Sequence, residues 1–180
     1  MELESLTKLL REARDGDSSA GSRAYALIYE RLHGAARAQL SRKTSGTLTP
    51  TALVNEAWLK LSAADYEIND REHYLALASR AMRQIVVDVA RASLSDKRGG
   101  DAVKVTLHDE LIDDSDVNVV RLEDALQRLD ALDERLAQVV QYRYFGGMSE
   151  EEIARLLGVT DRTVRRDWRK ARAFLYSELR

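Results

Sequence analysis

The chain has 180 residues, of which 44% are hydrophobic and 32% charged, and it contains a single proline and no cysteine. This balance predicts a packed core and argues against wholesale disorder, while the scarcity of proline and glycine argues against a turn-rich sandwich or barrel. Without cysteine the chain has no disulfide, no thiolate zinc site and no cysteine nucleophile, which fits a cytoplasmic protein.

The sequence also argues against a metalloprotein, a membrane protein and a secreted protein. The three histidines lie far apart, so we expect no metal site and no cofactor. No apolar run approaches the ~20 residues of a membrane span, and the first residues lack a secretory signal, so we expect no membrane contact. The chain is therefore expected to be a soluble, mostly helical protein of the cytoplasm.

The net charge of −2 hides a strong asymmetry along the chain. Residues 109–116 are rich in aspartate and glutamate, whereas residues 160–172 are rich in arginine. Nucleic-acid binding depends on where charge sits more than on the total, so a near-neutral chain is compatible with a DNA-binding surface.

The first 95 residues predict helices throughout. Apolar residues recur at helical spacing from Leu3 to Leu10 and again from Tyr25 to Leu40. Thr49-Pro50 is a strong helix-start signal, because threonine can cap a helix and proline suits its first position. After a break, a long alanine-containing helix is expected from about Arg71 to Leu94.

Residues 96–120 interrupt this pattern. A charged, glycine-containing stretch precedes the acidic residues, and apolar side chains are sparse. We interpret this segment as a flexible acidic linker between two small helical domains, residues 1–95 and 121–180.

The last 60 residues predict a helix-turn-helix. One helix is expected from Arg121 to about Tyr144. Ser149 and Glu152 form a capping box, Gly158 makes a turn, and Thr160 caps the final helix. In that final helix one stripe of residues is apolar: Val164, Trp168, Ala171 and Leu175. The basic residues outside the stripe are Arg162, Arg165, Arg166, Arg169 and Lys170. Such a face is typical of a helix that lies in the major groove, although a solvated basic surface is the simpler alternative.

Several motifs in this half resemble region 4 of bacterial sigma factors, most closely those of the extracytoplasmic-function class of the sigma-70 family. They are residues 129–135 (LDALDER), 142–149 (YRYFGGMS), 152–154 (EIA), 157–160 (LGVT) and 163–168 (TVRRDW). Two earlier segments resemble region 2 of the same family, namely residues 51–61 (TALVNEAWLKL) and 73–88 (HYLALASRAMRQIVVD). The resemblance covers nearly the whole chain in the family's order.

The resemblance implies an all-α protein that is not an enzyme but supplies promoter recognition to core RNA polymerase. The five basic residues of the final helix would then face the upstream (−35) promoter element, with Arg165 and Arg166 as base readers and Lys170 as a phosphate contact. At the downstream (−10) element, the family opens the duplex by flipping a base, and Gln84 occupies the position of an amide side chain that takes part. Arg80, Arg83 and Arg91 would hold the DNA backbone, with simple surface solvation as the alternative for Arg80 and Arg83. Gln84 stands where asparagine is commoner, and the loop 65–72 would select the flipped base.

Residues 51–61 would dock on the polymerase clamp, with Ala52, Asn55 and Glu56 at the contact. Most members carry an aspartate where this chain has Ala52, so a charge-assisted contact of ~1.5–3 kcal/mol is missing. A phosphate on Thr51 would restore negative charge at the start of this helix, where anions are favoured. We therefore expect regulation by a Ser/Thr protein kinase, as in a subgroup of the class, with Thr49 as the second choice of site. The simpler alternative is that Thr49 caps, Thr51 is an ordinary first-turn residue and Ala52 is tolerated.

Three rival functions are weighed at this point, of which an anti-sigma-like interaction protein does not explain the basic face of the final helix. A stand-alone helix-turn-helix regulator would bind DNA as a dimer without needing polymerase. An enzyme built on His73 and Asp88 would lack a phosphate-binding loop, a nucleophile elbow and metal-ligand spacing.

Overall fold

The computed structural model describes residues 2–40, 48–95, 103–107 and 115–180, and within these it is almost entirely helical. The predicted all-α class is confirmed. No helix among these residues is long and apolar enough to cross a membrane.

In residues 2–40 and 48–95, the N-terminal half forms four helices: α1 (Glu2–Arg14), α2 (Ser18–Gln39), α3 (Pro50–Ala63) and α4 (Arg71–Ser95). Asp17 caps α2 by accepting hydrogen bonds from the amides of Ser19 and Ala20. Thr49 caps α3 by accepting from the Ala52 amide at 3.1 Å, and Pro50 occupies the first turn. The predicted start of this helix is therefore confirmed.

A short antiparallel hairpin follows, made of β1 (Lys104–Leu107) and β2 (Ser115–Asn118). Val105 pairs with Val117 across the hairpin and also bridges to Leu40 at the end of α2. Val103, Val105 and Val117 are all buried. The described part of segment 96–120 is thus ordered, which our interpretation as a flexible linker did not anticipate. The few apolar residues of this segment alternate along one strand face, and that alternation is what buries them. Most of the acidic stretch, residues 108–114, lies outside the described residues.

The C-terminal half comprises α5 (Val119–Leu132), α6 (Glu134–Val140), the π-helical turn η1 (Gln141–Phe145), α7 (Glu150–Leu157) and α8 (Asp161–Leu179). The single helix that we expected from 121 to about 144 is divided at Asp133. This residue has extended backbone angles, and its carboxylate accepts from the amides of Arg135 and Leu136, which starts a new helix.

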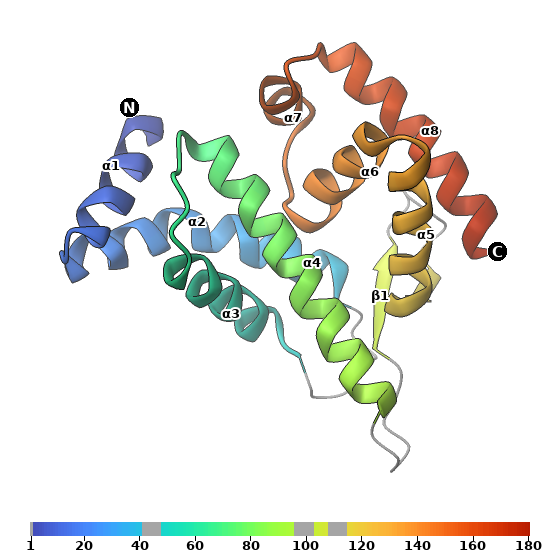
Figure 1. The fold of residues 1–180 in the computed structure, drawn as a ribbon, viewed down its shortest axis with the longest axis horizontal. Coiled ribbons are helices and arrows are strands. Elements are labelled where there is room, and N and C mark those ends of the chain that lie inside the picture. Colours follow the sequence, from blue (N-terminus) through green and yellow to red (C-terminus); the bar gives the residue numbers. More distant parts are fainter. Residues whose placement is uncertain (1, 41–47, 96–102, 108–114) are drawn as a thin grey trace.

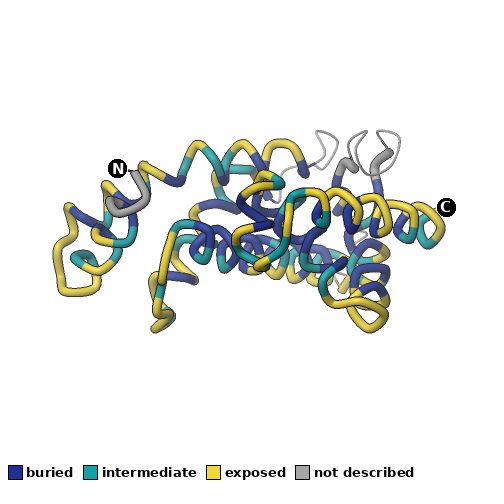
Figure 2. The backbone as a smooth tube through the Cα atoms, turned by 90° about the horizontal axis from the view of Figure 1, so that it is seen from above, coloured by how far each residue is buried: buried dark blue, intermediate teal, exposed yellow. Residues whose placement is uncertain are grey.

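The two halves share one hydrophobic core. Figure 1 shows α4 between helices α1–α3 and helices α5–α8, and α4 contacts both groups. In Figure 2 the buried segments lie in the middle of the molecule, where the halves meet, and the ends are exposed. The halves approach each other closely at Gly146 and Gly147. A Cβ atom at Gly146 would lie 3.0 Å from Cβ of Ser79, and one at Gly147 would lie 3.2 Å from Cβ of Ala35.

Candidate nucleic-acid interface

Helices α7 and α8 form the helix-turn-helix. Ser149 and Glu152 make the predicted capping box at the start of α7. Gly158 ends α7 in the left-handed conformation, with φ 65° and ψ 35°, which glycine adopts at little cost. The hydroxyl of Thr160 accepts from the Thr163 amide at the start of α8. The capping residues and Gly158 therefore determine the turn that orients α8 relative to α7.

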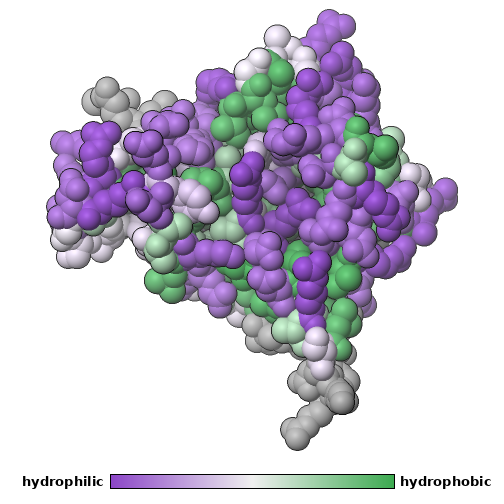
Figure 3. All heavy atoms as spheres, in the orientation of Figure 1, coloured by the Kyte–Doolittle hydropathy of each residue, from purple (hydrophilic) through white to green (hydrophobic). Residues whose placement is uncertain are grey.

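One face of α8 is buried and the opposite face is basic and exposed. The buried side chains are the predicted stripe of Val164, Trp168, Ala171 and Leu175. The predicted basic residues Arg162, Arg165, Arg166, Arg169 and Lys170 are all exposed, and so is Arg172. Figure 3 shows hydrophilic side chains along α8 at the upper right of the molecule. Cations spaced along one accessible helix face can contact phosphates and guanine edges.

Two acidic residues partly restrain this basic face. The guanidinium of Arg165 lies 3.1 Å from a carboxylate oxygen of Glu150, at the start of α7. Arg166 lies 3.8 Å from Asp167. Both arginines remain more than half exposed, so water screens these pairs strongly. They orient the side chains while leaving them free to exchange partners.

The sequence did not lead us to predict the ion pair that holds the buried side of α8 against α6. Asp167 is only 1% exposed and bonds to Arg135 of α6, with Nε to Oδ2 at 2.6 Å. This hydrogen bond and the charge of Asp167 raise the pKa of Arg135 above its ordinary value. The guanidinium of Arg143 lies 4.4 Å from the ring centroid of Trp168. A signal was present, because Asp167 precedes Trp168 and falls on the apolar side of the helix, where a carboxylate requires a partner.

Three of the four positions assigned to the downstream element lie together on α4. Arg80, Gln84 and Arg91 are exposed and follow one another at spacings of four and seven, which places them on one face. The amide of Gln84 donates to Asp88 at 2.8 Å.

Arg83 differs from the other three because it faces the C-terminal half. Its Nε and Nη2 donate to the two carboxylate oxygens of Glu123 on α5, at 2.9 and 3.1 Å. Its Nη1 donates to Gln141 at 3.0 Å. The Arg83 side chain is only 17% exposed. Arg83 and Arg80 line one cleft of about 320 Å³ against α5 and α6, whereas Gln84 and Arg91 do not line it.

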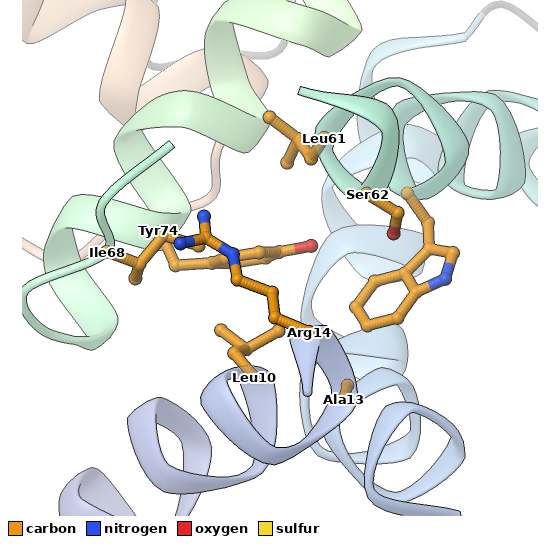
Figure 4. A pocket seen from close by; sticks show the side chains of 8 residues that line it. Leu10, Ala13, Arg14, Leu61, Ser62, Ile68 and Tyr74 are labelled. Atoms are coloured by element: carbon orange, nitrogen blue, oxygen red, sulfur yellow. The ribbon is translucent and has the colours of Figure 1, made fainter. Parts of the chain in front are cut away.

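A small pocket adjoins the loop between α3 and α4. Its volume is about 120 Å³, and Figure 4 shows the hydroxyl of Tyr74 pointing into it between α1 and α3. No described residue forms a hydrogen bond with this hydroxyl, and burial raises its pKa above the ordinary value. The lining residues are Leu10, Ala13, Arg14, Trp58, Leu61, Ser62, Ile68 and Tyr74. Ile68 belongs to the loop 65–72, so the pocket lies beside the segment that we expected to select a flipped base.

The predicted polymerase-docking residues lie on the outer side of α3. Asn55 and Glu56 are exposed, and Ala52 is half-buried. The hydroxyl of Tyr25 on α2 donates to the Asn55 side chain, which holds that side chain against α2. A broad groove of about 670 Å³ runs past Asn55 and includes Leu59, which is 66% exposed. The groove is lined by apolar and polar side chains, among them Trp58 and Ser62.

Thr51 and Thr49 differ in how far their hydroxyls are engaged. The Thr49 hydroxyl caps α3. Thr51 is exposed in the first turn, and its Oγ1 lies 3.4 Å from Nε2 of His33 on α2. The His33 ring stacks on Tyr29, with centroids 5.1 Å apart. The sequence contained no sign of the His33 contact, because 18 residues separate it from Thr51.

Comparison with known proteins shows the family of the chain. The sequence model of the family described as ECF sigma factor matches residues 3–180. Among solved structures, that of CnrH in complex with the cytosolic domain of CnrY is similar, with a TM-score of 0.49 and 19% identity over 95% of this chain and 94% of that chain. No match was found among curated proteins. Within the part of the chain that the structure describes, no group of histidine or acidic residues could hold a metal ion.

Proposed function

The chain belongs to the family of extracytoplasmic-function sigma factors, and on that premise we propose that it binds core RNA polymerase and directs initiation at specific promoters. The observation that carries the proposal is that each half of the molecule has one helix with an exposed polar or basic face. In the C-terminal half, α8 presents the five predicted basic residues, all exposed, on a helix-turn-helix held by buried contacts. In the N-terminal half, α4 presents Arg80, Gln84 and Arg91 on one exposed face.

Each face alone makes few DNA contacts. Tethering both faces to one polymerase raises their effective concentration for a promoter that carries both elements, so weak contacts combine into strong recognition. In this proposal Arg165 and Arg166 read bases, while Lys170 contacts phosphate. Loss of an arginine that reads a base should relax preference at that position, by ~1–3 kcal/mol.

Gel filtration with core polymerase separates this function from a stand-alone regulator. We expect the chain to co-elute with core polymerase, and the R165A/R166A variant to co-elute equally because its substitutions lie away from α3. The double variant E56Q/L59A, which removes one charge and one exposed apolar side chain from the docking surface, should reduce co-elution. A wild-type chain that elutes apart from polymerase in every modification state, yet binds a palindromic DNA as a dimer, would support the stand-alone regulator.

The same proposal includes control by a Ser/Thr kinase at Thr51. The hydroxyl is exposed, it lies in the first turn of the docking helix, and His33 is the nearest side-chain partner. A phosphate there would add about −1.5 to −2 charges beside the position where Ala52 stands. It would thereby supply the negative charge that the docking surface lacks.

A matched pair of variants tests this charge effect. Thr51→Glu and Thr51→Gln have the same size and differ in one charge, so we expect the Glu variant to bind core polymerase about tenfold more tightly, equivalent to ~1.4 kcal/mol. Surface plasmon resonance on immobilised polymerase measures the difference. Equal affinities for the two variants, together with equal affinities of unmodified and Thr51-phosphorylated wild-type protein, would refute the switch.

A further inference from the structure

One carboxylate of α7 links a buried ring of α8 to an arginine that we propose as a base reader. Glu150 is the first residue of α7, and one of its carboxylate oxygens lies 3.1 Å from Nε of Arg165. Its other oxygen accepts a hydrogen bond from Nη1 of Arg143 at 3.2 Å. The Arg143 guanidinium lies 4.4 Å from the ring centroid of Trp168, which is buried. We call these four side chains the Glu150 network.

The Glu150 network holds Arg165 differently from its neighbour Arg166. The partner of Arg166 is Asp167 at 3.8 Å, and that carboxylate is already bonded to α6. The partner of Arg165 belongs to a different helix and is itself held by Arg143. Glu150 and Arg143 are 28% and 21% exposed, whereas Arg165 is 59% exposed. The network therefore holds one end of a guanidinium that otherwise reaches solvent.

The atom of Arg165 that faces Glu150 is the one nearest its own backbone. This atom is Nε, and the two terminal nitrogens form the far edge of the planar guanidinium. A guanine accepts two hydrogen bonds at O6 and N7 from such an arginine fork. An arginine without a partner samples many rotamers, and ordering it on binding costs affinity. A partner at Nε orders the side chain before DNA binds and leaves the terminal nitrogens for the base.

Neither stability nor DNA affinity explains a carboxylate at this position. An ion pair as exposed as that between Arg165 and Glu150 contributes little to folding. A negative charge beside a DNA-binding helix repels phosphate, so Glu150 should weaken non-specific binding. The start of α7 favours negative charge, but Glu151 and Glu152 supply it in the same turn. What the contacts of Glu150 do provide is a fixed direction for Arg165.

We propose that Glu150 is a positioning residue for promoter recognition, which directs the guanidinium of Arg165 at one base pair of the upstream element. Arg143 holds Glu150 in place, and the stacking of Arg143 on Trp168 ties the network to the buried side of α8. The inference rests on the proposed function, because it takes α8 as the helix that reads this element. It adds two residues outside α8 that set the preference for one base pair.

A promoter library with a randomised upstream element tests this positioning. Core polymerase and the full chain, in the modification state that initiates, transcribe the library, and the transcripts are sequenced. The R165A variant first identifies the base pair that depends on Arg165. E150Q keeps the size of the side chain and removes its charge. We expect it to lower the preference at that same base pair about fivefold, because Arg165 must then be ordered on binding. Preferences at the other base pairs should not change.

The matched control is E151Q, which removes the same charge from the neighbouring residue. The Glu151 carboxylate bonds to its own backbone amide and to Ser149, and these hydrogen bonds lower its pKa, a shift to which the charge of Arg165 contributes least. We expect E150Q and E151Q to strengthen binding of random-sequence duplex DNA equally in fluorescence anisotropy, and only E150Q to change a base preference. If the two variants have the same base preferences, or if E150Q lowers output from all sequences alike, the positioning role is refuted.

A second variant, R143M, removes the guanidinium that holds Glu150 and leaves an unbranched side chain beside Trp168. We expect it to weaken the preference at the same base pair as E150Q. Because both residues act on Arg165 through one contact, E150Q/R143M should lose no more preference than E150Q alone. Additive losses in the double variant would overturn the role of Arg143. Circular dichroism shows whether each variant folds, and E150Q carries the test by itself if R143M does not.

Side-chain NMR separates failure of this inference from failure of the proposed function. The order parameter of the Arg165 Nε–H bond, measured on the full chain without DNA, should fall in E150Q and keep its wild-type value in E151Q. An unchanged order parameter in E150Q, or a lower one with unchanged base preferences, overturns the inference and leaves the proposed function intact. A wild-type chain with no preference for any upstream sequence overturns the proposed function, and the inference fails with it.

Discussion

Asp167 and Arg135 show how much one buried charge depends on its partner. Asp167 is nearly inaccessible to solvent and is bonded by Arg135, while Arg166 lies 3.8 Å away on the surface. Removal of Arg135 would leave the carboxylate buried with only the more distant Arg166, and an uncompensated buried charge is strongly destabilising.

We therefore expect R135A to lower the free energy of unfolding by about 2–3 kcal/mol. The control is R128A, which breaks the exposed pair between Arg128 and Glu178 and should cost less than about 1 kcal/mol. Urea unfolding followed by circular dichroism measures both. Similar losses for the two variants would show that the bracing of α8 does not depend on Arg135.

The buried hydroxyls of Tyr74 and Tyr144 should lower the free energy of unfolding at alkaline pH. Burial raises the pKa of the Tyr74 and Tyr144 hydroxyls above the ordinary value of 10.0. Above pH 10 these groups ionise in the unfolded chain but stay neutral in the folded one, so rising pH favours unfolding, whereas below pH 10 they have no such effect.

The Y74F variant removes one of these groups. Between pH 9 and pH 11 we expect Y74F to lose about 1.4 kcal/mol less stability than wild type, since one shifted phenol contributes that much per pH unit. Urea unfolding at the two pH values measures the difference. Parallel losses in the two proteins would mean that Tyr74 titrates normally in the folded state.

At the scale of single residues, sequence predicted the local contacts and missed the distant ones. The caps at Thr49, Ser149 and Thr160 follow from side chains that bond to amides a few positions away. The partners of Arg83 and Thr51 come from helices far along the chain. Such partners depend on tertiary packing, which no local pattern encodes.

At the scale of elements, two glycines with the same backbone conformation have different surroundings. Gly147 and Gly158 have φ values of 60° and 65°. A Cβ at Gly158 would meet nothing within 4 Å, whereas one at Gly147 would press on Ala35 at 3.2 Å.

We expect G158A to cost about 1 kcal/mol, which is the penalty of the left-handed conformation alone. G147A should cost measurably more, because the turn must also move away from α2. Thermal and urea unfolding of the two variants compare the costs directly. Equal costs would indicate that the contact between Gly147 and α2 adds nothing to stability.

Helix positions were largely predictable from the sequence, and the exceptions have physical causes. Apolar periodicity and capping residues placed α3, α4, α7 and α8 correctly. The division between α5 and α6 was missed because periodicity continues across Asp133, and only its backbone angles reveal the break. The hairpin was missed because each strand has only four residues and the two strands are separated by residues 108–114 in the chain. Val105 also pairs with Leu40, which lies far away in the sequence.

At the scale of the whole molecule, packing between the halves could not be predicted from either half alone. The sequence divides into two helical groups, and their separate motifs indicate separate surfaces. The structure joins them through one core, the Gly146–Gly147 turn and ion pairs such as that between Arg83 and Glu123.

Mapping transcript 5′ ends tests the central claim most directly. Core polymerase is incubated with genomic DNA of the organism that encodes the chain, with and without the protein, and the 5′ ends are sequenced. We predict that the wild-type or Thr51-phosphorylated chain produces start sites that share one upstream and one downstream sequence, and that R165A/R166A loses these sites. Transcripts with the same scattered 5′ ends whether or not the chain is present would contradict the account.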